Sequence, residues 1–244
     1  MRHGPTPAAP TAAPTAAAPL LRARVPLTAA HALTAAHALT ALLALTALLA
    51  LTAAALLSAP ASLAAQERPI IMIDAGHGGD DPGVVEGELL EKDLVLRIAF
   101  AVASEFVRAG HDVRFTRTGD YAVAWNDRRA QAEEVGAALL LMLHINRNDD
   151  PTRHGAEVYF SEELPASRRA AAAFGEAFAA EEIAVLVDPR PFPFLQSPEV
   201  PTVMLEVGFL TNPVERRLLV SESYHHELGR LFVRATEALL TPTR

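Results

Sequence analysis

Three polar residues stand at apolar runs in this sequence, and their types suit metal-assisted hydrolysis. His77 lies in a glycine-rich loop after one such run, His144 directly follows another, and Glu206 lies within a third. A hydrolytic zinc site needs three protein ligands, an open position for water and a nearby carboxylate that takes the proton of that water. Because the chain has no cysteine, such a site would have to use histidine and carboxylate ligands.

Each candidate also has a structural interpretation. His77 could occupy an ordinary turn, and His144 could be a buried histidine that is only hydrogen-bonded. Glu206 could form a salt bridge with an arginine, although burial near a cation is also how a general base is tuned. Glu91, at the start of a long predicted helix, is the kind of acid that commonly complements the helix dipole.

The elements that must position these residues alternate between strands and helices. Apolar runs and alternation predict strands, and apolar residues at helical spacing predict helices. This order favours an α/β fold, a single domain with a mostly parallel twisted sheet flanked by helices on both faces. In such folds functional sites lie at the carboxyl ends of the strands, where His77, His144 and Glu206 are expected. The expected strands are 69–74, 111–117, 137–143, 156–160 and 201–206, the expected helices are 91–109, 125–135, 166–182, 213–220 and 222–240, and 187–193 is expected to be a linker.

Four separate motifs, in order and at matching spacing, together resemble one known family. They are Ile73-Asp74-Ala75-Gly76-His77-Gly78-Gly79 with Asp81-Pro82-Gly83, then Glu91-Lys92-Asp93, then Leu143-His144-Ile145-Asn146, and finally Glu206-Val207-Gly208-Phe209-Leu210-Thr211-Asn212-Pro213. The sequence resembles the zinc-dependent N-acetylmuramoyl-L-alanine amidases of the bacterial cell wall, the Amidase_3 family, over residues 69–240.

The resemblance implies a role for particular residues of this chain. His77, Glu91 and His144 would bind one Zn²⁺ per chain, and Glu206 would be the catalytic carboxylate. Asn146 and Arg128 would contact the substrate. The implied reaction is hydrolysis of the amide that joins N-acetylmuramic acid to L-alanine of the stem peptide in peptidoglycan. Two alternatives stay open, which are a catalytically silent peptidoglycan-binding module and a zinc hydrolase of another cell-wall amide.

Two further expectations concern the surroundings of the site. Some relatives carry an inhibitory helix between the second histidine and the catalytic glutamate. The corresponding segment here has room for a single helix, residues 166–182, so we expect an open site. Trp125, at the start of a predicted helix, is expected to pack in the core rather than to contact a sugar.

Residues 1–65 differ in composition from the rest of the chain. They are built almost wholly from Ala, Leu, Thr and Pro, and residues 38–57 include no charged side chain. Small residues at 59–64 complete a pattern typical of an export signal. The alternative is an uncleaved membrane anchor, because about 20 apolar residues can span a bilayer. We therefore expect an exported protein of the periplasm or cell envelope, with its catalytic domain at residues 66–244.

The charge of the chain limits its partners. The net charge is −8, and the only charged residues of 1–65 are three arginines, so residues 66–244 carry −11. A nucleic-acid partner is not expected, because binding to phosphates needs clustered basic residues. We expect a monomer that acts on peptidoglycan and meets a membrane only through the possible anchor.

Overall fold

The computed structural model describes residues 37–48 and 68–241. The chain divides into two units, residues 1–64 and 65–244. In the first unit, residues 37–48 form a helix whose side chains are exposed. No helix among the described residues is long and apolar enough to cross a membrane. Residues 49–57 of the apolar segment lie outside the described residues, so the export signal and the anchor both stay predictions.

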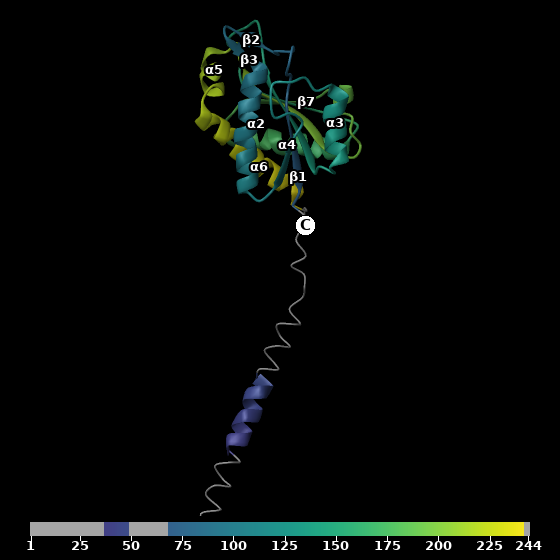
Figure 1. The fold of residues 1–244 in the computed structure, drawn as a ribbon. Helices are drawn as coiled ribbons and strands as arrows, with labels where there is room; N and C mark the ends of the chain where they lie inside the picture. The colour runs from purple at the N-terminus through teal and green to yellow at the C-terminus, as the bar shows by residue number, and fades with distance from the viewer. Residues whose placement is uncertain (1–36, 49–67, 242–244) are drawn as a thin grey trace, which may run out of the picture. The chain divides into compact units, whose positions relative to one another are not determined.

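A six-stranded sheet forms the centre of the second unit (Figure 1). Its strand order is β4-β1-β5-β8-β6-β7, and every neighbouring pair is parallel except β8 and β6. The mostly parallel sheet expected from the sequence is therefore confirmed. The strands are β1 (Ile70–Ala75), β4 (Asp112–Phe115), β5 (Leu139–Asn146), β6 (Ala156–Phe160), β7 (Val185–Pro189) and β8 (Thr202–Phe209), and a separate hairpin pairs β2 (Val85–Glu86) with β3 (Leu89–Leu90).

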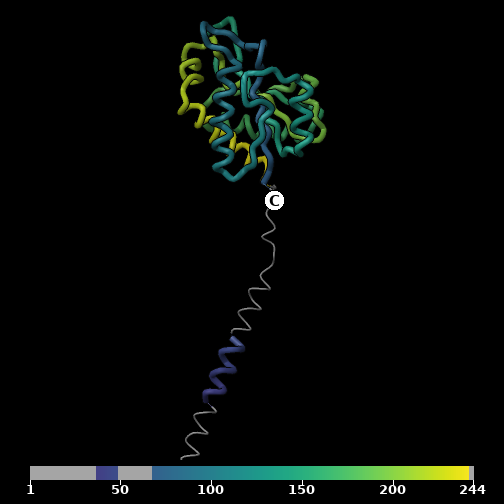
Figure 2. Tube along the Cα trace, in the orientation of Figure 1, coloured from purple at the N-terminus to yellow at the C-terminus, as the bar shows by residue number. Residues whose placement is uncertain are grey.

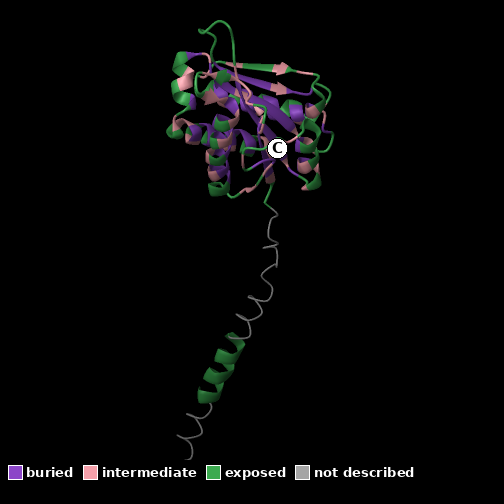
Figure 3. Ribbon diagram, turned by 45° about the horizontal axis from the view of Figure 1, so that its top comes forward, coloured by how far each residue is buried: buried purple, intermediate pink, exposed green. Residues whose placement is uncertain are grey.

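Helices cover both faces of this sheet, as expected. One face packs against α2, α4 and α6, and the other packs against α3 and the short 3-10 helix η1. The strands are largely buried between helices whose outer sides are exposed (Figure 3). The helices are α2 (Glu91–Arg108), α3 (Trp125–Glu134), α4 (Pro165–Ala180), η1 (Pro193–Leu195), α5 (Pro213–Leu219) and α6 (Glu222–Leu240).

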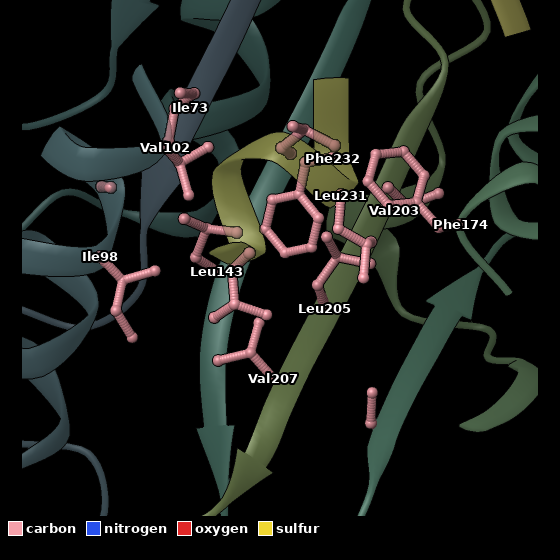
Figure 4. Packing of buried hydrophobic residues seen from close by; sticks show 14 of the residues in the cluster. Ile73, Ile98, Val102, Leu143, Phe174, Val203, Leu205, Val207, Leu231 and Phe232 are labelled. Atoms are coloured by element: carbon pink, nitrogen blue, oxygen red, sulfur yellow. The ribbon is translucent and has the colours of Figure 1, made fainter. Parts of the chain in front are cut away.

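The larger core lies between the sheet and helices α2, α4 and α6. Leu143 and Leu205 of the central strands are fully buried there with Val102 of α2 and Phe232 of α6 (Figure 4). Helices α2 and α6, far apart in sequence, run side by side (Figure 2). A Cβ at Gly229 of α6 would lie only 3.1 Å from the Cα of Val102, so glycine permits this close approach.

Two of the expected element boundaries were wrong in ways that concern the site. The first three residues of the expected linker 187–193 belong to strand β7, which pairs in parallel with β6 at the edge of the sheet. Strands β5 and β8 also run further than expected, to Asn146 and Phe209. His144, expected just past the end of its strand, therefore lies within β5, and Glu206, expected at the end of its strand, lies inside β8, where the pairing of β5 with β8 fixes both positions.

Candidate metal centre and active site

The loop after β1 presents His77 in a constrained backbone conformation. His77, Gly78 and Gly79 all have positive φ values, of 60°, 121° and 61°. The left-handed region costs a non-glycine residue about 1 kcal/mol or more, so surrounding contacts must hold His77 in place. One such contact joins His77 Nδ1 to Asp81 Oδ2 at 2.8 Å. That bond occupies Nδ1 and leaves Nε2 directed at the other candidate ligands.

Two buried arginines hold the backbone of this loop from behind. Arg128 donates from Nη1 to the carbonyl of Ala75 at 2.8 Å and from Nη2 to the carbonyl of His77 at 2.7 Å. Arg117 donates from Nη2 to the carbonyl of Gly76 at 2.8 Å. The exposed fractions are 3% for Arg128 and 1% for Arg117. The two guanidinium groups therefore fix the loop that carries His77.

The position of Arg128 corrects an expectation from the sequence. Arg128 was expected to contact the substrate, but its side chain is buried and also pairs with Asp74, at 2.6 Å between Nη1 and Oδ1. Helix α3 directs the side chain of this arginine into the interior. A buried cation needs carbonyl and carboxylate partners, and the end of β1 supplies them. Arg128 thus holds the backbone of the loop that carries His77.

Glu91 and His144 complete a compact group of ligand atoms with His77. Glu91 Oε1 lies 3.0 Å from His77 Nε2 and 3.0 Å from His144 Nδ1, and the two nitrogen atoms are 3.1 Å apart. Burial raises the pKa of Glu91, but hydrogen bonds with His144 and His77 outweigh it and lower that pKa to about 2. Glu91 is therefore ionised here, the form in which a carboxylate binds a metal ion.

The donor set of this group fits Zn²⁺. Within the described residues, His77, Glu91 and His144 are the one histidine and carboxylate group whose ligand atoms converge in this way, all within 4.8 Å of one another. Two imidazoles and one carboxylate form a common ligand set of hydrolytic zinc sites. Glu91 Oε2 accepts a hydrogen bond from the backbone N–H of Val84 at 2.8 Å, a partner of the kind that orients metal ligands.

Glu206 lies beside this group on the neighbouring strand. It is the cross-strand partner of His144 on β5, and its Oε2 is buried without a hydrogen-bond partner among the described residues. Burial, followed by the negative charges of Glu91 and Glu157, raises the pKa of Glu206 to about 8. No arginine pairs with Glu206 in the described part of the chain, so the salt-bridge interpretation was wrong. A cation bound nearby would stabilise its charged form.

The sequence reasoning missed Glu157, which links several residues near the site. Glu157 is the partner of Glu206 across the antiparallel β6–β8 pair. It accepts hydrogen bonds from Asn146 Nδ2 at 2.8 Å and from the hydroxyl of Tyr159. Glu157 and Tyr159 are two residues apart on a strand, so they share one face, and this spacing was the available signal.

The three candidate ligands and Glu206 line a cavity of about 590 Å³. One wall is aromatic, and it includes Trp125, which was expected in the core but is 39% exposed. Trp125 is stacked with His144 at 5.8 Å between ring centroids and with Phe194 at 4.3 Å. The cavity is lined by His77, Val84, Glu91, Trp125, His144, Ile145, Asn146, Tyr159, Arg190, Pro191, Phe192, Phe194, Met204 and Glu206.

Comparison with known proteins identifies the family to which this site belongs. The N-acetylmuramoyl-L-alanine amidase family, Amidase_3, matches residues 71–238. The chain belongs to this family. The family resemblance seen in the sequence is thereby confirmed, whereas the roles of the individual ligands and of Glu206 stay predictions.

Individual relatives of this amidase family member agree with the assignment. The amidase AmiC of Neisseria meningitidis is 27% identical over 210 residues, which are 67% of this chain and 50% of AmiC. The chain thus spans about half the length of that relative. The amidase AmiA of Salmonella typhimurium is 28% identical, and the alignment covers 66% of this chain and 72% of AmiA.

A solved structure supports the fold in the same way. The catalytic domain of the amidase CwlV from Bacillus (Paenibacillus) polymyxa var. colistinus superposes with a TM-score of 0.65 at 26% identity. That superposition covers 70% of this chain and 98% of CwlV's catalytic domain. The α/β fold class expected from the sequence is confirmed by this likeness.

Proposed function

We propose that this protein hydrolyses the amide between N-acetylmuramic acid and L-alanine in peptidoglycan, with Zn²⁺ held by His77, Glu91 and His144. The observation that carries the proposal is the convergence of these three ligands in the lining of an open cavity, with the unpaired carboxylate of Glu206 on the adjacent strand. Bound there, Zn²⁺ would supply an activated water molecule and polarise the carbonyl of the scissile amide.

The residues of the chain divide the remaining work. Glu206 accepts the proton of the attacking water at its carboxylate and passes it to the nitrogen of the leaving L-alanine. Burial of Oε2 without a partner keeps this carboxylate free for proton transfer. Asn146 lines the cavity and donates to Glu157, and we propose that it contacts the substrate.

We also propose that the site is open without an activating partner. Helix α4 is the one helix between the second histidine and the catalytic glutamate, apart from the three-residue η1. Phe174 and Phe178 of α4 are fully buried in the core, and no residue of α4 lines the cavity. An isolated protein that stays inactive until another protein is added would contradict this proposal.

Digestion of purified peptidoglycan, followed by mass analysis, tests the proposed reaction. We expect free stem peptides that begin with L-alanine, and we expect chelation to abolish them and added Zn²⁺ to restore them. Peptides cut at crosslinks would support the alternative of another cell-wall amide. Binding to peptidoglycan without any release would support the alternative of a silent binding module.

A substitution separates the roles of the ligands and the base. Glu206→Gln should retain Zn²⁺ and lower kcat by about a hundredfold or more, because general-base catalysis contributes roughly 10²–10⁴. His77→Ala should lose both the metal and the activity. Metal content and initial rates measured on the same samples check this prediction, and wild-type activity in Glu206→Gln would contradict it.

We also propose that the protein is exported, through a cleaved signal or an uncleaved anchor in residues 1–65. We propose further that it acts as a monomer. Sequencing the N-terminus of the protein recovered from its native cell envelope would distinguish cleavage from anchoring.

A further inference from the structure

The cavity has a single cationic side chain on its wall. Arg190 is the only lysine or arginine among the described residues that line it. Its backbone N–H donates to the carbonyl of Phe160 at 2.8 Å, which continues the pairing of β7 with β6. The side chain is 42% exposed, so the guanidinium is accessible to a ligand in the cavity. The backbone of Arg190 is therefore fixed by the sheet, whereas its guanidinium is accessible.

Two contacts hold the guanidinium of Arg190 in position. Its Cζ lies 5.0 Å from the ring centroid of Tyr159, and its Nη2 lies 2.7 Å from Asp188 Oδ2. A guanidinium has five N–H donors, more than one carboxylate can use. The ring of Tyr159 and the carboxylate of Asp188 thus orient the guanidinium, and some of its N–H donors stay available for a ligand.

The distance between Arg190 and Glu206 can be bounded from the strand register. Tyr159 follows Glu157 by two residues on β6, which is about 6.6 Å, and Glu157 and Glu206 are cross-strand partners about 5 Å apart. Arg190 and Glu206 line the same cavity, and these steps place the guanidinium on the order of 10 Å from the Glu206 carboxylate. Two residues of extended peptide span about 7 Å, and a contact of about 3 Å at each end brings the reach to about 13 Å, so a carboxylate within two residues of the scissile amide can reach the guanidinium.

The rest of the cavity gives an anionic ligand no other cationic side chain. Apart from the three ligands, Glu206 and Asn146, its remaining lining residues are aromatic or aliphatic. Arg190 is therefore the one lysine or arginine in the lining with which a carboxylate on the substrate could form an ion pair. Guanidinium groups pair with carboxylates through two parallel hydrogen bonds, which also fixes the orientation of the partner.

We propose that Arg190 binds a free carboxylate on the stem peptide, one or two residues beyond the scissile amide, and so makes the enzyme prefer carboxylate over carboxamide stems. This inference rests on the proposed function and adds a specificity-determining residue to it.

Two synthetic substrates test the proposal. Both are N-acetylmuramoyl tripeptides with an amidated C-terminus, and in both the second residue is a glutamate joined to the third residue through its γ-carboxyl. They differ only in the α-group of that glutamate, which is a carboxylate in one and a carboxamide in the other. For the full chain loaded with Zn²⁺, we expect kcat/KM to favour the carboxylate by about five- to tenfold, mainly through KM. That preference should shrink at high salt, because the guanidinium is partly exposed.

Variants assign the preference to Arg190. Arg190→Gln should reduce it to less than about twofold, Arg190→Lys should retain part of it, and Asp188→Asn should increase it by removing the competing acid. Arg168→Gln is the matched control, because Arg168 is an exposed arginine outside the cavity that pairs with Glu162. An unchanged preference in Arg190→Gln, with both substrates still cleaved, would overturn the inference alone. Failure of the wild-type protein to cleave either substrate would overturn the proposed function, and this inference with it.

Discussion

Gly76 leaves the space that the ring of His144 occupies, and an added methyl group should disrupt the proposed metal site. A Cβ at Gly76 would lie 2.3 Å from Cε1, 2.5 Å from Nε2 and 2.7 Å from Nδ1 of His144. Ordinary contacts between carbon atoms are about 3.5–4.0 Å, so the ring would have to move by roughly 1 Å. The backbone of Gly76 is outside the left-handed region, so alanine itself causes no backbone strain there.

The packing around His144 leaves its ring little room to move. The ring is 3% exposed, and Trp125 is stacked with it, with Phe194 stacked in turn on Trp125. Moving the ring by about 1 Å therefore disturbs a packed row of aromatic side chains, at a cost of about 1–3 kcal/mol in stability. A displaced ligand should weaken Zn²⁺ binding by about a hundredfold, the upper end of what the loss of a ligand's supporting contacts costs.

Competition with a chromophoric chelator measures the affinity for Zn²⁺ in the Gly76→Ala variant. Trp125 is the only tryptophan of the chain and is stacked with His144, so its fluorescence gives a second readout of the same site. Gly119→Ala is the matched control, because its Cβ would meet only the ring of Tyr121, at 3.4 Å and 3.5 Å. Wild-type affinity in Gly76→Ala, or an equal loss in Gly119→Ala, would refute the reasoning.

Two predictions concern buried charges away from the ligands themselves. Arg128→Met should destabilise the fold by about 3–5 kcal/mol in urea unfolding, because it leaves the buried carboxylate of Asp74 without its counter-ion. In the Asp74→Asn background the same substitution should cost much less, and an equal loss there would contradict the pairing. Hydrogen bonds from Arg108 and His226 lower the pKa of Glu105, so its contribution is present at neutral pH and is lost as the pH falls through that lowered value. Glu105→Gln should cost about 0.5–1 kcal/mol at neutral pH and progressively less below pH 4.5, and a cost independent of pH would argue against this pair.

The sequence was sufficient to predict that His77 and His144 lie close together, because the determinants are local. His77 and His144 each follow an apolar run that can only be a buried strand, and parallel strands bring their carboxyl ends to one edge of a sheet. Glu91 is different, because an acid in a first helical turn has an ordinary explanation, and its assignment as a ligand came from the family resemblance. The structure adds the reason that it can act with the histidines, which is its position 3.0 Å from both of them.

The parts that the sequence did not predict depend on partners far along the chain. Strand β7 contains an aspartate and ends at Pro189, and an edge strand with one paired side needs little apolar patterning, so it looked like a linker. Helix α3 is polar almost all round, which conceals that Arg128 points inward to carbonyl groups of β1 and its loop. Trp125 lies at the cavity because Phe194, almost 70 residues later, provides the surface on which it stacks.

The charges around Glu206 connect the fold to the proposed chemistry. The sequence allowed this carboxylate an arginine as its partner, but the two buried arginines near the site, Arg117 and Arg128, donate to the backbone of the His77 loop instead. Glu206 is left among negative charges, and its pKa rises to about 8. A dication at His77, Glu91 and His144 would supply the missing positive charge, bring that pKa down and leave the carboxylate ionised near neutral pH. The same arginines that hold the loop of His77 thus leave the proposed general base to be balanced by the proposed metal ion, which would couple proton transfer to metal occupancy.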